Sequence, residues 1–116
     1  MTRLINIVAG LSGACALMAL AASHHLASVE DAREWVLLAA IVQLSAALAG
    51  LVIAGRSGAL NLIAGGLILA GASLFAAEIY LHAFLNNTAL EMMAPVGGAA
   101  AILGWIVLAF AKPDPR

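Results

Sequence analysis

The chain has 116 residues, of which 65% are hydrophobic and 9% are charged, with five Lys and Arg residues against six Asp and Glu residues. Soluble domains carry about 45–50% apolar and about 25% charged residues, so this composition excludes a water-soluble enzyme with a polar cleft and indicates an integral membrane protein. The net charge of −1 excludes a nucleic-acid-binding protein. The single cysteine, Cys15, excludes a disulfide framework.

Apolar segments divide the chain into four predicted membrane-spanning helices. A helix needs about 20 apolar residues to cross about 30 Å of hydrocarbon, and four segments are long enough: 4–23, 35–54, 59–85 and 94–111. These segments are too long and too uniformly apolar for the strands of a transmembrane barrel. We therefore predict an all-α integral membrane protein in which residues 1–116 form one domain, a bundle of four transmembrane helices.

The two ends of this predicted domain leave alternatives open. Arg3, the apolar run after it and Ala19-Leu20-Ala21 are similar to a secretory signal peptide, whose cleavage would leave three spans. A fourth helix that began at Ala89 would be kinked by Pro95, whereas a later start would place the proline harmlessly in the first turn.

Basic residues are unequally divided between the two sides of the predicted bundle. With four spans, both termini and the short link 55–58 lie on the same side. That side carries four of the five basic residues, Arg3, Arg56, Lys112 and Arg116, and the other side carries only Arg33. The positive-inside rule therefore predicts that both termini are cytoplasmic.

Small residues predict the faces through which the spans pack, because helices in lipid associate by close packing. The residues predicted to pack are Gly50 in the second span, Gly66 and Gly71 in the third, and Pro95, Gly97, Gly98 and Gly104 in the fourth. Packing within one chain uses these faces first, and a face left over would support a homo-oligomer.

Four polar residues form a candidate cluster near one side of the membrane. Glu78 lies inside the third span, where a carboxylate must be neutralised, paired or hydrated. His82 follows four residues later on the same helix face. Gln43 in the second span lies at nearly the same depth as Glu78, and His24 lies at the end of the first span.

This cluster has three interpretations. Glu78 and His82 can exchange protons in a transporter. Glu78 can instead bond to Gln43 or a histidine within the bundle, or contact a partner subunit. The histidines do not have the spacing of a metal site, and no motif indicates a cofactor.

Several short segments resemble a family of small four-span proteins, domain of unknown function 423, which includes YgdD-type inner-membrane proteins and transmembrane protein 256. The resemblance covers nearly the whole chain. Its residues are Ala94-Pro95-Val96-Gly97-Gly98, Gly104-Trp105, Gly71, Leu74-Phe75, Tyr80, Gln43 and His24. The resemblance implies four helices in a bacterial inner membrane and no established activity.

The chain also departs from the pattern of this family. Glu78 stands where a small residue such as serine is typical, Ala46 where histidine is usual, and His25 in place of a glycine. A proton-coupled mechanism common to the family therefore cannot depend on Glu78, which favours a role specific to this chain, such as contact with a particular partner.

These observations favour a non-enzymatic membrane protein that packs, among lipids and partner spans, as an accessory or assembly subunit of a larger inner-membrane complex. The alternatives are a small proton-coupled transporter or channel that uses Glu78, and a lipid-organising homo-oligomer.

Overall fold

The computed structural model describes residues 2–25 and 30–113 of the chain. Its helices are α1 (Thr2–Ala22), followed by the short 3-10 turn η1 (Ser23–His25), then α2 (Glu30–Ala54), α3 (Ala59–Leu85) and α4 (Met93–Phe110). Within these described residues, four helices are long and apolar enough to cross a membrane. The predicted all-helical, four-span fold is thus confirmed, and the third helix has the predicted bounds.

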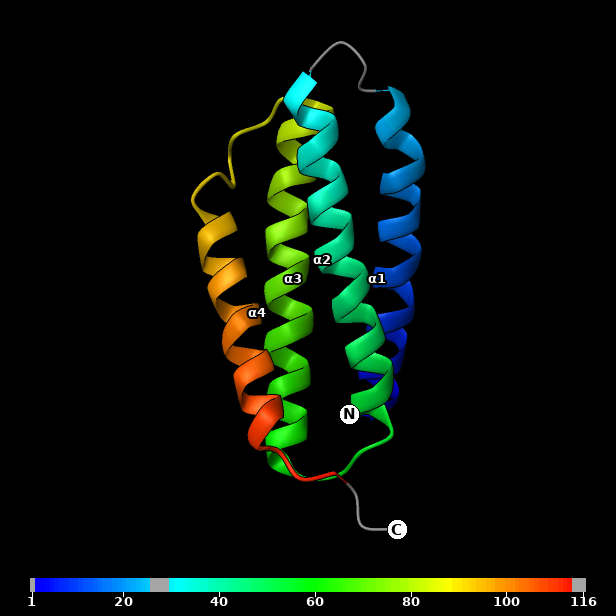
Figure 1. Ribbon diagram of the computed structural model, residues 1–116, viewed down its shortest axis with the longest axis vertical. Helices are drawn as coiled ribbons and strands as arrows, with labels where there is room; N and C mark the ends of the chain where they lie inside the picture. The colour runs from blue at the N-terminus through cyan, green and yellow to red at the C-terminus, as the bar shows by residue number, and fades with distance from the viewer. Residues whose placement is uncertain (1, 26–29, 114–116) are drawn as a thin grey trace.

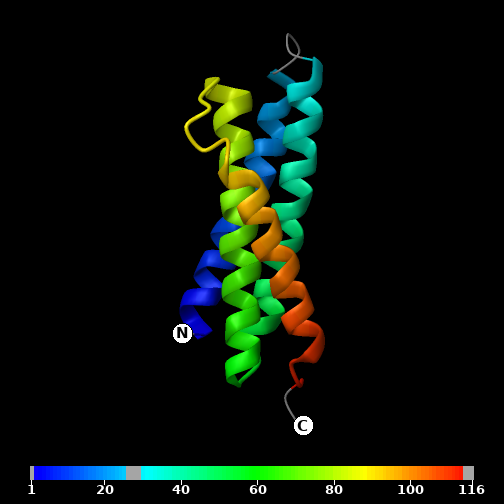
Figure 2. The ribbon, with the colours of Figure 1, turned by 90° about the vertical axis from the view of Figure 1, so that its left-hand side faces the viewer.

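The helices run alternately up and down and form an open bundle (Figure 1). Helix α2 packs between α1 and α3, and α4 packs on α3 alone among the helices described. Figure 2 shows α4 lying against α3 with α2 to one side. The start of α1, the 55–58 link and the end of α4 lie together, and we call this the terminal end. The opposite end, with η1, the start of α2 and the 86–92 loop, is the far end.

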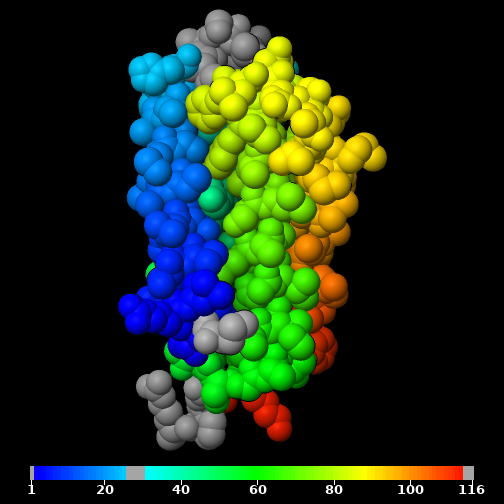
Figure 3. All heavy atoms as spheres, turned by 180° about the vertical axis from the view of Figure 1, so that it is seen from behind, coloured from blue at the N-terminus to red at the C-terminus, as the bar shows by residue number. Residues whose placement is uncertain are grey.

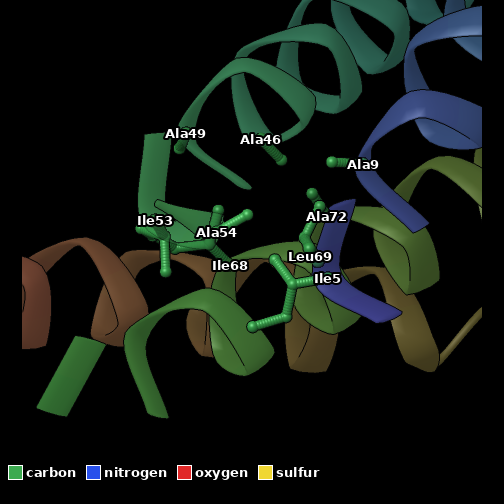
Figure 4. Packing of buried hydrophobic residues seen from close by; sticks show 9 residues of the cluster. All are labelled: Ile5, Ala9, Ala46, Ala49, Ile53, Ala54, Ile68, Leu69 and Ala72. Atoms are coloured by element: carbon green, nitrogen blue, oxygen red, sulfur yellow. The ribbon is translucent and has the colours of Figure 1, made fainter. Parts of the chain in front are cut away.

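The core where α1, α2 and α3 meet consists mainly of alanine (Figure 4). Its buried residues are Ile5, Ala9, Ala46, Ala49, Ile53, Ala54, Ile68, Leu69 and Ala72. Gly50 lies at the meeting point, because a Cβ atom there would be 3.0 Å from both Ala9 Cβ and Leu69 Cδ1. Small side chains let these backbones approach, which is what stabilises helix contacts in lipid.

Helices α3 and α4 approach even more closely. A Cβ atom on Gly71 would lie 2.7 Å from the carbonyl oxygen of Gly97, and one on Gly104 would lie 2.8 Å from the backbone nitrogen of Ile68. Real Cβ contacts are never this short, so these positions accept only glycine at the present spacing of the two helices.

Three residues predicted to pack, Gly66, Gly98 and Pro95, lie outside the close contacts between helices. Gly66 is exposed, with no atom within 4 Å of its Cβ position, and the neighbouring Gly65 contacts α2 instead, 3.0 Å from Ile53 Cγ2. Consecutive helical residues point about 100° apart, so a choice between two adjacent glycines depends on helix rotation. Gly98 meets only the edge of the Phe75 ring, at 3.9 Å, and Pro95 is exposed.

The start of α4 settles the alternatives for Pro95. Residues before Met93 form turns, in which the Met93 N–H donates to the carbonyl oxygen of Leu90 at 2.8 Å. Pro95 therefore lies in the first turn of α4, where its missing N–H costs no helical hydrogen bond.

Candidate functional site

A hollow of about 350 Å³ lies at the far end between α2, α3 and the start of α4. Helix α3 has 27 residues and α4 has 18, which correspond to about 40 Å and about 27 Å at 1.5 Å per residue. Helix α4 therefore stops short of the far end and leaves the last turns of α3 partly uncovered. The residues that line the hollow are Trp35, Glu78, Ile79, His82, Glu91 and Ala94.

Glu78 and His82 lie together in this hollow. The side chain of Glu78 is 8% exposed and that of His82 is 35% exposed, and Glu78 Oε1 lies 3.9 Å from His82 Nδ1. This distance is suitable for an ion pair with a protonated histidine but too long for a hydrogen bond. Trp35 from α2 packs against the imidazole, with ring centroids 5.4 Å apart. Among the described residues, His82 is the only polar partner of Glu78.

Gln43 belongs to a different contact. It is buried, and its Oε1 atom accepts a hydrogen bond of 2.8 Å from the Tyr80 hydroxyl, which connects α2 with α3. Tyr80 comes two residues after Glu78, so the two side chains leave α3 in nearly opposite directions. Gln43 meets the Tyr80 side of the helix, and this rotation separates it from Glu78.

His24 lies in a third group at the surface of the far end. Its Nδ1 atom is 2.8 Å from Nη2 of Arg33, and both side chains are exposed. The structure thus brings together only Glu78 and His82 of the four residues expected to form one cluster, and Glu91 and Trp35 complete their hollow.

Asn61 is a polar residue that the sequence analysis did not select. It is 3% exposed, and its Nδ2 atom donates to the carbonyl oxygens of Ser57 at 2.9 Å and Lys112 at 3.0 Å. Its Oδ1 atom accepts from Arg56 at 3.4 Å. Asn61 therefore ties the first turn of α3 to the 55–58 link and to the chain after α4. The feature of the sequence that could have pointed to Asn61 is its position just after the short 55–58 link.

The fold and the far-end hollow indicate the class of this protein, although they do not indicate an activity. The four apolar helices of the described residues, with a small hollow at one end that Glu78 and His82 line, are those of a small multi-pass membrane protein. No group of three or more His, Cys, Asp or Glu residues in the described ranges is arranged to hold a metal ion.

The chain belongs to the family described as protein of unknown function DUF423, whose family model matches residues 10–98. This match confirms the resemblance found in the sequence. No solved structure is found to match the chain.

Proposed function

We propose that this chain is a non-enzymatic accessory or assembly subunit, and that a partner span lies between α2 and α4. The observation that carries the proposal is the packing of α4 on α3 alone. This packing leaves a furrow between α2 and α4, which is closed by α3 at its base and open to the membrane.

Two hollows lie along this α2–α4 furrow. The first is the far-end hollow already described, and the second has about 390 Å³ and is lined by Ser45, Leu48, Ala49, Val52, Trp105 and Leu108. Trp35 and Ala49 are separated by fourteen residues of α2, as Ala94 and Leu108 are in α4. Fourteen residues are nearly four full turns, so both hollows open on the same side of the bundle and one straight helix can cover them.

The charge of the far end favours a partner with a basic side chain there. Glu78 and Glu91 line one hollow, and His82 is the only residue in its lining that can carry positive charge. Arg33 is nearby in sequence but contacts His24. A Lys or Arg on the partner would complement the two carboxylates, and such pairing is favourable where water is scarce.

The test is site-specific photo-crosslinking of the tagged chain at native expression. A crosslinking residue replaces either Leu48 in the furrow or, as the control, Leu17 on α1, which lines neither hollow of the furrow. The two leucines are almost equally exposed, at 60% for Leu48 and 58% for Leu17. We expect Leu48 to give one stoichiometric product by mass spectrometry and Leu17 to give none.

A matched pair of substitutions checks that capture depends on the furrow. Ser45→Leu adds a bulky side chain inside the furrow, and Ala14→Leu adds one at an exposed position of α1. We expect the first variant to lose the partner and the second to keep it. Recovery of the chain alone as a defined oligomer, or equal capture by both variants, would contradict an accessory role in this furrow.

Proton-coupled transport is a second candidate, favoured by the nearly buried carboxyl group of Glu78 with the imidazole of His82 3.9 Å away. In a reconstituted system, this mechanism predicts that Glu78→Gln abolishes proton-driven solute flux and preserves the fold. Unchanged flux in that variant would exclude it.

A further inference from the structure

A second furrow lies on the opposite side of the bundle, between α1 and α3. Figure 3 views this side, where α1 and α3 lie next to each other with α2 visible between them. The furrow contains an apolar hollow of about 430 Å³, whose lining includes Val8 of α1 and Gly66, Ala70 and Ser73 of α3. Gly66 gives the furrow its depth, because nothing lies within 4 Å of its Cβ position.

This apolar hollow continues into a partly polar one at the terminal end, which we call the polar hollow. The polar hollow has about 330 Å³, and Thr2, Arg56 and Gly58 are among its lining residues. Ile5 and Leu62 line both hollows, so the two share a wall and follow each other along the α1–α3 furrow.

The charge at this end favours an anion. The charged side chains described at the terminal end are Arg3, Arg56 and Lys112, all of them basic. Arg56 lines the polar hollow, and its Nη1 atom is held by Asn61 Oδ1 at 3.4 Å. A guanidinium group carries five N–H donors and binds phosphate oxygens well.

The length of the furrow matches one leaflet of a membrane. Ser73 lies eleven residues after Leu62 on α3, so the two are about 16 Å apart along the helix at 1.5 Å per residue. The hydrocarbon core of a bilayer is about 30 Å thick, so one leaflet supplies about 15 Å of acyl chain.

We propose that the α1–α3 furrow binds one anionic glycerophospholipid, with its phosphate at Arg56 and one acyl chain along Gly66 and Ala70. The site is independent of the proposed partner furrow, which lies on the other side of α3. It differs from ordinary lipid contact in requiring both a phosphate-binding side chain and an unfilled apolar furrow.

Native mass spectrometry of the full chain in mild detergent tests this site. The probes are dioleoylphosphatidylglycerol, which is anionic, and dioleoylphosphatidylcholine, which has the same acyl chains and no net charge. We expect one phosphatidylglycerol to be retained per chain under conditions that remove phosphatidylcholine. Equal retention of the two lipids would overturn the proposal.

Four variants separate a built site from general attraction. Gly66→Leu fills the furrow, and Gly10→Leu is its control, because Gly10 is exposed, has open space at its Cβ position and lies outside the hollow. Arg56→Gln removes the charge in the polar hollow, and Arg3→Gln removes a charge at the same end but outside that hollow.

We expect Gly66→Leu and Arg56→Gln each to lower phosphatidylglycerol retention about tenfold or more. Gly66→Leu removes the surface that the acyl chain contacts, and Arg56→Gln removes a charged hydrogen bond to the phosphate. The two control variants are expected to retain the lipid. Undiminished retention by Gly66→Leu would overturn the proposal. So would an equal loss in Arg3→Gln and Arg56→Gln, which would indicate diffuse electrostatic attraction. Unchanged thermal melting of each variant confirms that the fold is preserved.

Discussion

Gly71 and Gly97 face each other so closely that each excludes a side chain from the other. A Cβ atom on Gly71 would lie 2.7 Å from Gly97 O, and a Cβ atom on Gly97 would lie 2.6 Å from Gly71 O. The obstacle in both directions is backbone, which cannot turn aside as a flexible side chain can. The spacing of α3 and α4 at this crossing therefore depends on both residues being glycine.

Gly97→Ala is expected to push α4 away from α3 and to lower the free energy of unfolding by about 1–3 kcal/mol, the usual cost of overpacking. Gly98→Ala is the matched control, because its added methyl group meets only the Phe75 ring at an ordinary 3.9 Å. Thermal melting in detergent, followed by circular dichroism, measures both. Equal melting temperatures for the two variants would refute the close contact.

The hydrogen bond from Tyr80 to Gln43 is expected to contribute modestly to stability. Tyr80→Phe removes its donor, and we expect a loss of about 0.6 kcal/mol, with about 1.7 kcal/mol as an upper value for such bonds in membranes. A double-mutant cycle with Gln43→Leu measures the pairwise energy. Strictly additive effects would show that the two side chains do not interact.

Asn61 is expected to matter more, because it makes one hydrogen bond to the backbone of the neighbouring 55–58 link and another to the distant backbone of Lys112. Asn61→Leu should destabilise the protein by about 1–3 kcal/mol through loss of these bonds and release the chain after α4 to proteases. Asn6→Leu alters the same residue type at an exposed position of α1. If Asn6→Leu proves as harmful, the effect is not due to the ties at the terminal end.

The orientation in the membrane is also testable. In a Cys15→Ser background, Thr88→Cys should react with an impermeant thiol reagent added to intact spheroplasts, because the positive-inside rule predicts that the far end is outside. Lys112→Cys should react only after permeabilisation. The reverse pattern would invert the predicted topology.

Hydropathy alone predicted the four spans, because the length of an apolar segment reports how deep each residue lies in the membrane. It also placed Glu78 and Gln43 at similar depth. It could not predict that Gln43 would bond to Tyr80, because this depends on the rotation of α2 and α3 about their axes.

The glycines show the same limit: the sequence predicts their depth in the membrane but not the direction in which each one faces. Gly65 and Gly66 are adjacent and chemically identical, and only the direction of their Cβ positions decides which one contacts α2. Gly97 and Gly98 differ in the same way. Helices with small residues on several sides carry no clear apolar face in their sequence, so their contact faces follow from three-dimensional packing.

The packing of α4 on α3 alone also bears on how the protein is made. A closed bundle needs all its helices at once, whereas here the buried residues of the core come from α1, α2 and α3, and α4 adds only the partly buried Leu108 at its edge. We therefore expect that two genes, one encoding residues 1–87 and one encoding residues 88–116, can together replace the single gene. Helix α4 would then associate as a separate chain with the assembled α1–α3 unit, through its glycine-mediated contact with α3.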